Sequence, residues 1–234
     1  MSNSFYVSSS DLFKEQFQEV DYGVLKQYIY IRGVRQKDIK VTFDEKKTSE
    51  EEKCRREQIR IKGKIKELAL CNNFEYFYTQ TLNDNRYDLD NFVKEVKQHF
   101  KAYKRKHEKF IYLIIYEKHK DGAYHLHGLV GGLGLDVYTN ENGYLSLSSL
   151  EDLGYNSLKK LGTTDLDKIK VSNYVTKYIT KDFVKTSSGV SYFHSKGLKT
   201  AKRTIITNPT SFSFIFNHYK MIYENEFVKI YEEK

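Results

Sequence analysis

The amino-acid sequence predicts an α+β fold in which helices pack on an antiparallel sheet. Residues 74–82 are rich in aromatic and β-branched side chains, a composition typical of strands. Residues 110–130 hold two apolar runs on either side of an Asp-Gly turn, the pattern of a β-hairpin. Amphipathic helices are expected before and after this hairpin. We therefore expect two helices on one face of an antiparallel sheet rather than a parallel, wound α/β fold.

The helices are indicated by polar caps and by the spacing of apolar residues. Acidic residues after a polar cap predict a charged helix over about 48–70. A second helix is expected to begin at Asp88 or Asp90, with apolar residues on one face and lysines on the other. A third helix is expected over residues 167–183.

The order of these elements indicates one main domain with an extension at each end. Residues 1–45 form a polar lead-in with short strands, of which 29–31 and 39–43 are the best candidates. Residues 46–205 hold the helices, the hairpin and the motifs described below. Residues 206–234 form a C-terminal extension that we expect to pack on the same domain.

Composition and charge narrow the class of protein. The formal net charge is +8, which favours a polyanionic partner such as nucleic acid. The cysteines, Cys54 and Cys71, lack metal-type spacing and are expected to be reduced thiols. No signal-peptide pattern and no apolar run long enough to cross a bilayer is visible in the sequence. We therefore expect a cytoplasmic protein with no membrane partner.

A pair of histidines marks the second strand of the hairpin. In His125-Leu126-His127 the two imidazoles project together, because side chains two apart in a strand share a face. The partner strand ends in Glu117, and the turn brings this carboxylate nearly opposite His125. Two imidazoles and a carboxylate suit Mg²⁺ or Mn²⁺ bound together with a phosphate oxygen. His119 is a competing third ligand that lies closer to the turn.

Two tyrosines lie one turn apart on the third expected helix. Tyr174 and Tyr178 flank its apolar stripe, with Lys177 and Lys181 just beyond them. Two phenols and two ammonium groups would then share one rim between core and solvent. Taken alone, a structural role is the more common one for such tyrosines, with the ring buried and the hydroxyl solvated.

Together the histidines and tyrosines indicate phosphodiester chemistry. A phenolate can attack a metal-polarised phosphodiester and form a covalent phosphotyrosine. Lys177 beside the phenols lowers the cost of the phenolate and of charge in the transition state. The covalent bond keeps the ester energy, so the ends can be rejoined without ATP. The sequence lacks a G-x-x-x-x-G-K-[ST] motif, which fits this scheme.

Three stretches of the chain resemble the motifs of HUH replication initiators, in which two histidines flank a bulky residue. They are Phe77-Tyr78-Thr79-Gln80-Thr81-Leu82, His125-Leu126-His127 and Tyr174-x-x-Lys177-Tyr178. The likeness runs from about residue 71 to residue 202. It is strongest to replication proteins of Gram-positive phages and rolling-circle plasmids, akin to the filamentous-phage gene II type.

The resemblance implies a ferredoxin-like or RNA-recognition-like core built on a five-stranded antiparallel sheet. It implies a divalent metal, Mn²⁺ or Mg²⁺, held by His125, His127 and Glu117. It also implies that Tyr174 or Tyr178 is the nucleophile, or that the two alternate.

An initiator of this kind nicks single-stranded origin DNA and stays joined to the 5′-phosphate. The free 3′-hydroxyl then primes a host polymerase, with a host helicase opening the duplex, and a second transesterification rejoins the ends. The candidate phosphate contacts are Lys181, Lys196, Lys199, Lys202 and Arg203.

Other functions share part of this pattern. A mobilisation relaxase or a transposase of the same superfamily would use the same chemistry in another role. A non-catalytic nucleic-acid-binding module would keep the histidines as structural residues. A histidine-based nucleotide hydrolase fits poorly, because position 129 is Leu129 rather than a third histidine and no second H-x-[ST] is present.

Overall fold

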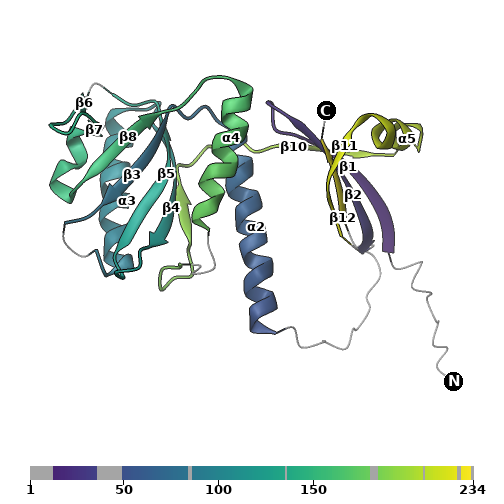
Figure 1. The fold of residues 1–234 in the computed structure, drawn as a ribbon, viewed down its shortest axis with the longest axis horizontal. Coiled ribbons are helices and arrows are strands. Elements are labelled where there is room, and N and C mark those ends of the chain that lie inside the picture. Colours follow the sequence, from purple (N-terminus) through teal and green to yellow (C-terminus); the bar gives the residue numbers. More distant parts are fainter. Residues whose placement is uncertain are drawn as a thin grey trace. The chain divides into compact units, whose positions relative to one another are not determined.

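The computed structural model describes residues 13–35, 49–83, 86–134, 136–179, 184–207, 209–225 and 228–232. The chain divides into two compact units (Figure 1). The central unit is residues 50–200 and carries the three motifs described above. The terminal unit combines residues before position 50 with residues after position 200.

The central unit is built on a seven-stranded antiparallel sheet with the order β6-β7-β8-β3-β5-β4-β9. Its strands are β3 (Tyr76–Thr81), β4 (Ile111–Lys118), β5 (Tyr124–Gly131), β6 (Val137–Thr139), β7 (Leu145–Leu147), β8 (Asn156–Lys160) and β9 (Tyr192–His194). Its helices are α2 (Glu50–Cys71), α3 (Leu89–Lys106) and α4 (Asp165–Val175), with 3₁₀ turns η1 (Ser148–Leu153) and η2 (Thr176–Tyr178). The predicted α+β class, with helices packed on antiparallel strands, is confirmed.

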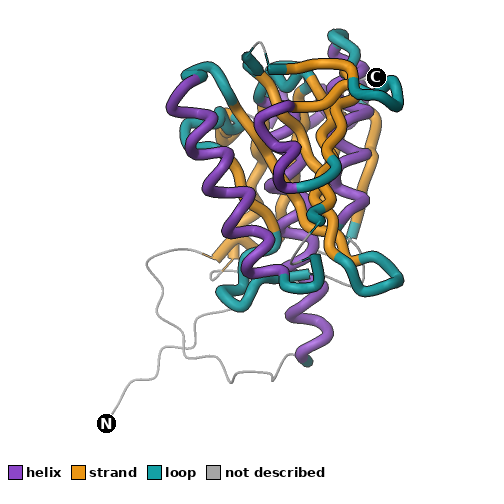
Figure 2. Tube along the Cα trace, turned by 90° about the vertical axis from the view of Figure 1, so that its left-hand side faces the viewer, coloured by secondary structure: helices purple, strands orange, loops and turns teal. Residues whose placement is uncertain are grey.

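Helices cover both faces of this sheet (Figure 2). Phe92 and other apolar residues of α3 pack on one face, together with Ile114 of β4. Ile65 of α2 and Val175 of α4 pack on the other face, together with Ile115. The expectation that the two helices flanking the hairpin share one face is therefore wrong. The reason lies in β4, where the neighbouring residues Ile114 and Ile115 are both fully buried and each side needs a cover.

Side-chain caps define where two helices begin. Asp88 accepts a hydrogen bond from the backbone N–H of Asn91, so it is the N-cap of α3. Thr164 and Asp167 form a capping box at the start of α4, each accepting a hydrogen bond from the other's backbone N–H. The third helix therefore begins at Asp165, slightly earlier than expected.

That helix also ends earlier than the sequence predicts. Its last turn, η2, is a 3₁₀ turn, and the backbone leaves helical geometry at Ile179, with φ −85° and ψ 78°. Both Val175 and Ile179 are buried on the sheet, so the apolar stripe that the sequence predicts is kept although the last turn is tighter. Residues 180–183 of the expected helix lie outside the described residues.

The terminal unit holds a second, five-stranded antiparallel sheet with the order β10-β1-β2-β12-β11. Its elements are β1 (Phe13–Asp21), β2 (Lys26–Arg35), β10 (Lys202–Ile206), α5 (Pro209–His218), β11 (Lys220–Glu224) and β12 (Val228–Glu232). The expected strand at 29–31 is part of β2, whereas the one at 39–43 lies outside the described residues. Ile215 of α5 packs with Phe17 and Tyr231 from the two ends of the chain.

No helix among the described residues is long and apolar enough to cross a membrane.

Candidate metal and tyrosine site

Strand register brings the polar residues of three neighbouring strands onto one face of the central sheet. Glu117 of β4 pairs with His125 of β5, as the hairpin predicts. On the other side of β5, Thr79 and Thr81 of β3 pair with His127 and His125. Because directly paired residues in an antiparallel sheet project to the same side, all five side chains share the face that α2 and α4 cover.

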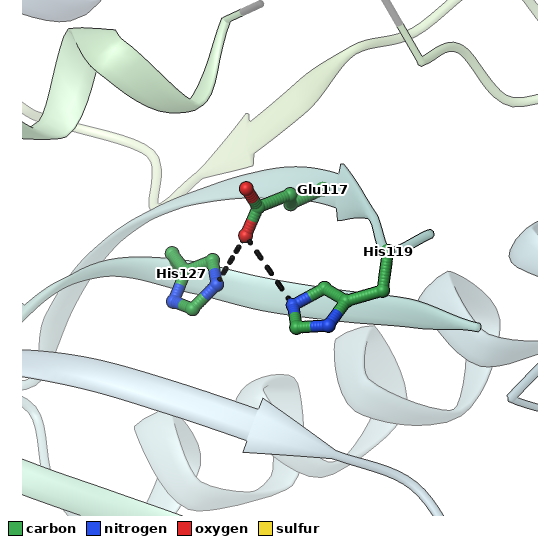
Figure 3. A group of neighbouring side chains, drawn as sticks. All are labelled: Glu117, His119 and His127. Atoms are coloured by element: carbon green, nitrogen blue, oxygen red, sulfur yellow. Dashed lines mark hydrogen bonds and ion pairs between the residues drawn. The ribbon is translucent and has the colours of Figure 1, made fainter. Parts of the chain in front are cut away.

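Glu117, His119 and His127 form a group that could hold a metal ion (Figure 3). The Glu117 Oε2 atom lies 2.8 Å from His127 Nε2 and 3.7 Å from His119 Nε2. One ligand atom from each residue lies within 4.8 Å of the others. The carboxylate thus lies between two imidazoles, one from β5 (His127) and one from the turn that follows β4 (His119).

His127 is held in place from both ring nitrogens and from its face. Its Nδ1 atom lies 3.3 Å from the Thr79 hydroxyl, and its ring stacks on the Tyr178 ring with centroids 4.1 Å apart. The residue is 9% exposed, and burial, reinforced by His125 and His119, lowers its pKa from 6.5 to about 4. At neutral pH the imidazole is therefore uncharged, which is the state that binds metals.

The Thr79 hydroxyl suits either form of this imidazole. A hydroxyl can accept a hydrogen bond or donate one. With Nε2 protonated, the ring donates to Glu117 and Nδ1 accepts from Thr79. With Nε2 free for a metal, Nδ1–H donates to Thr79 instead, so the ring need not rotate. Partners of this kind on the second nitrogen are usual for metal-binding histidines.

His125 has a different environment. Its Nδ1 atom lies 2.9 Å from the Thr81 hydroxyl, and its ring stacks on His119 with centroids 3.7 Å apart. Burial lowers its pKa, with a further contribution from the neighbouring His119. Among the described residues, the compact ligand group contains His119 and not His125. The structure therefore brings Glu117 and His119, the two alternatives for the third ligand, to the same site. The role of His125 as a ligand stays a prediction.

The two tyrosines meet beside His127. The Tyr178 hydroxyl donates a hydrogen bond to the Tyr174 hydroxyl, with the oxygens 2.8 Å apart. Tyr178 is half-buried, and burial, its hydrogen bond to Tyr174 and the charge of Glu117 raise its pKa above the usual value of 10. Tyr174 is 45% exposed. The pair therefore consists of an inner phenol that resists ionisation and an outer phenol open to solvent.

The cationic candidates are dispersed. Lys177 is exposed, with its Nζ atom 5.5 Å from the centroid of the Tyr174 ring. Lys196 and Lys199 are exposed in the central unit, and the backbone of Lys199 is held by the Asn72 side chain. Of the other predicted phosphate contacts, Lys202 and Arg203 lie on β10 of the terminal unit. Lys181 lies outside the described residues.

Three residues of the site have roles that the sequence reasoning did not assign. Thr79 and Thr81 each contact a histidine Nδ1, and Phe77 contacts the rings of Tyr174 and Tyr178 with centroids 5.3 and 5.9 Å apart. The sequence did contain a sign of the threonine contacts, because Thr79 and Thr81 are spaced two residues apart, as the two histidines are. The sequence did not reveal the strand register that pairs the two threonines with the two histidines.

The donor set fits a divalent metal. A carboxylate oxygen and neutral imidazole nitrogens, already within a few ångströms of one another, match the ligands that first-row divalent ions take in proteins. The solvent-facing side of the group leaves positions for a phosphate oxygen, because His119 is exposed and Glu117 is only half-buried.

Comparison with known proteins gives a family match. The model of a family of replication-associated proteins, described by its ORF2 and gene II protein members, matches residues 75–183, which is just under half of the chain. The matched segment runs from the start of β3 past η2, so it contains the histidines, Glu117 and both tyrosines. No curated protein and no solved structure gives a significant match. The central unit is thus similar to replication-associated proteins of the gene II type.

Proposed function

We propose that this protein is a rolling-circle replication initiator of the HUH type, which nicks and rejoins single-stranded origin DNA through a tyrosine. One observation carries the proposal: Tyr178, which is hydrogen-bonded to Tyr174, stacks against His127 of the candidate metal group. The match of this same segment to replication-associated proteins supports the role in replication. A nucleophile pair beside a metal-binding group is the combination that transesterification of DNA needs.

The metal would be held by Glu117 and His127, with His119 or His125 completing the set. When bound, a divalent ion, Mn²⁺ or Mg²⁺, supplies Lewis-acid polarisation of the phosphodiester and offsets charge in the transition state. Thr79 holds the His127 ring so that Nε2 faces Glu117, and the low pKa of about 4 keeps that nitrogen available at neutral pH.

Tyr174 is the better placed of the two nucleophile candidates. Burial and the charge of Glu117 oppose ionisation of Tyr178, whereas Tyr174 is exposed and accepts a hydrogen bond from the Tyr178 hydroxyl. That hydrogen bond stabilises negative charge on the Tyr174 oxygen. Lys177 lies over the Tyr174 ring and adds a favourable positive charge.

The reaction follows from this arrangement. The Tyr174 phenol loses its proton to solvent, and its oxygen attacks the scissile phosphorus. An O–P bond forms to the tyrosine while the P–O3′ bond breaks, which leaves a 5′-phosphotyrosine and a free 3′-hydroxyl. Attack by a 3′-hydroxyl on the phosphotyrosine reverses the step and rejoins DNA without ATP. In replication, the free 3′-hydroxyl would serve a host polymerase, with a host helicase unwinding the template.

A covalent-adduct assay tests the proposal. The protein is mixed with end-labelled single-stranded DNA tiled across its replicon, with Mn²⁺ or with EDTA, and adducts that survive SDS are counted. We expect a metal-dependent adduct in the wild type, none in Tyr174→Phe, and strong loss in His127→Ala. Tyr144→Phe removes the hydroxyl of another exposed tyrosine on the same unit and should leave the adduct unchanged. If no tile gives an adduct with either Mn²⁺ or Mg²⁺, the catalytic proposal fails.

A further inference from the structure

A cavity lies along the open edge of the central sheet, outside the candidate metal and tyrosine site. In the described part of the chain, β9 is the last strand of the sheet and pairs with β4 alone. Between β9 and α2 lies a cavity of about 340 Å³, here called the edge groove. It is lined by Glu57, Arg60 and Ile61 from α2 and by residues 189–194.

Strand register places the edge groove close to the candidate site. Tyr192 of β9 pairs with Ile115 of β4, and Ile115 pairs with His127 of β5. Paired residues share a face, so Tyr192 and His127 project to the same side of the sheet, two strands or about 10 Å apart. Glu117 follows Ile115 by two residues and points to that side as well. The edge groove and the candidate site therefore lie on the same face of the sheet, on either side of the buried Ile115.

The groove wall contains a buried hydroxyl that lacks a partner. Ser191 lines the groove and is 3% exposed, and its Oγ atom has no hydrogen-bond partner among the described residues. Buried polar groups in folded proteins are nearly always satisfied, and leaving one unpaired costs free energy. Strand alternation places the Ser191 side chain with Phe193, on the α3 side of β9, so this hydroxyl does not serve a ligand in the groove.

Positive charge flanks β9 on both of its sides. Arg60 is exposed on α2, and no carboxylate of the described residues forms an ion pair with it. Glu57, the acidic residue of the groove, is already paired with Lys185. From α3, on the opposite side of the sheet, the Lys97 Nζ atom lies 5.0 Å from the centroid of the Phe193 ring on β9. Lys97 lies behind the sheet, so Arg60 is the cation that faces the groove, where it complements an anionic ligand.

Two aromatic rings present faces along the same strand. Tyr192 and His194 alternate with Phe193 and so share the groove side of β9. Their rings are inclined by 22° with centroids 6.0 Å apart, and the His194 Nδ1 atom is held by the Ser195 carbonyl at 2.8 Å. Aromatic faces next to cations are the two features with which proteins bind single-stranded nucleic acid without reading its sequence.

We propose that the edge groove binds the nucleotides of single-stranded DNA that adjoin the scissile phosphate. Arg60 contacts a phosphate, and bases stack on Tyr192 and His194. The role of this strand as the substrate rests on the proposed nicking function, whereas the binding itself does not.

The test measures binding without cleavage. A fluorescein-labelled oligothymidylate of about twelve nucleotides is titrated with protein in EDTA, and its anisotropy is followed at several salt concentrations. We expect His194→Ala to weaken binding by roughly five-fold or more. Arg60→Ala should weaken binding and reduce the salt slope, log Kd against log salt, by about 0.7.

A matched control distinguishes the effect of a groove residue from the effect of removing any positive charge. Lys62→Ala removes one positive charge from the same helix two residues away, about 200° round its axis, and should leave affinity and slope close to those of the wild type. Thermal unfolding of each variant checks the fold. In addition, an oligonucleotide that carries 5-iodouracil should crosslink to the peptide containing residues 189–196 on irradiation, as read by mass spectrometry.

The outcomes distinguish this proposal from the proposed function. If Arg60→Ala and His194→Ala bind as tightly as Lys62→Ala, the edge groove is not a DNA site, and the adduct assay decides the nicking function separately. If the two groove variants lose affinity while the wild type forms no adduct, the groove proposal holds and the nicking function fails.

Discussion

Gly128 offers a quantitative test of the sheet at the candidate site. It follows His127 on β5, where a Cβ atom would lie 2.2 Å from the Leu113 carbonyl oxygen and 2.9 Å from the Ile114 Cα atom. Both of these atoms belong to the backbone of β4, so no side-chain rotation relieves the overlap. Gly128→Ala must therefore push the two central strands apart where they carry His127 and Glu117.

The magnitude follows from the overlap. Inserting one carbon into a packed core usually costs about 1–3 kcal/mol, and a contact with backbone lies at or above the upper end of that range. We expect Gly128→Ala to lower the free energy of unfolding by about 3 kcal/mol, and the midpoint of thermal unfolding by roughly 6–12 °C for a unit of this size.

Urea unfolding followed by circular dichroism measures this loss, and Gly63→Ala is the control. Gly63 lies within α2, where a Cβ atom meets nothing within 4 Å, so alanine should stabilise the helix by about 1 kcal/mol. Opposite signs for two identical substitutions are thus expected. A Gly128→Ala variant within about 0.5 kcal/mol of the wild type would refute the close packing of β4 against β5.

Three further predictions concern the site itself. Because the pKa of His127 falls from 6.5 to about 4 on folding, the metal-free protein should be most stable above pH 6.5 and lose up to about 3 kcal/mol as the pH falls to 4. His127→Gln should flatten that part of the urea-measured profile. Tyr178→Phe keeps the ring stack but removes the hydrogen bond to Tyr174; it should cost about 1 kcal/mol or less and slow adduct formation without abolishing it. Mn²⁺ at a hundred-fold excess over its Kd should stabilise the wild type by about 2.7 kcal/mol, and an equal shift in Glu117→Gln would count against the metal group.

The sequence is most informative where local physics decides structure. The hairpin, the first strand of the sheet and the cap at Asp88 follow from alternation, turn residues and side-chain hydrogen bonding. The pairing of Glu117 with His125 follows from the hairpin turn. These features depend on residues close together in the chain, so their signals survive without any knowledge of the tertiary fold.

The sequence misleads where packing overrides local preference. Apolar spacing predicts a third helix that continues past Tyr178, whereas the structure tightens into a 3₁₀ turn and leaves helical geometry at Ile179, which stays buried. The order of the elements also favours one shared face for the helices that flank the hairpin, although β4 is buried on both sides and requires cover on each. A continuous apolar run indicates that a strand is buried on both faces, but it does not indicate which element covers each face.

The terminal segments show what pattern alone does not reveal. Residues at both ends of the chain alternate as strands do, but nothing in either segment indicates its partner. The structure joins them, since β12 pairs with β2 and β10 pairs with β1. Such pairings bring together residues some two hundred positions apart, and their energy comes from side-chain packing that is absent in the separate segments.

The sequence by itself determined the chemical groups of the candidate site: paired histidines in a strand, a carboxylate across the hairpin, and two tyrosines one helical turn apart. Only the tertiary structure decided their neighbours. It placed Thr79 and Thr81 on the histidines, His119 beside Glu117, Tyr178 against His127, and β9 at the sheet edge with an unpaired Ser191 hydroxyl. The physical reason is that residue spacing sets which side chains share a face of one element. Which faces meet depends on how the elements pack their apolar surfaces together.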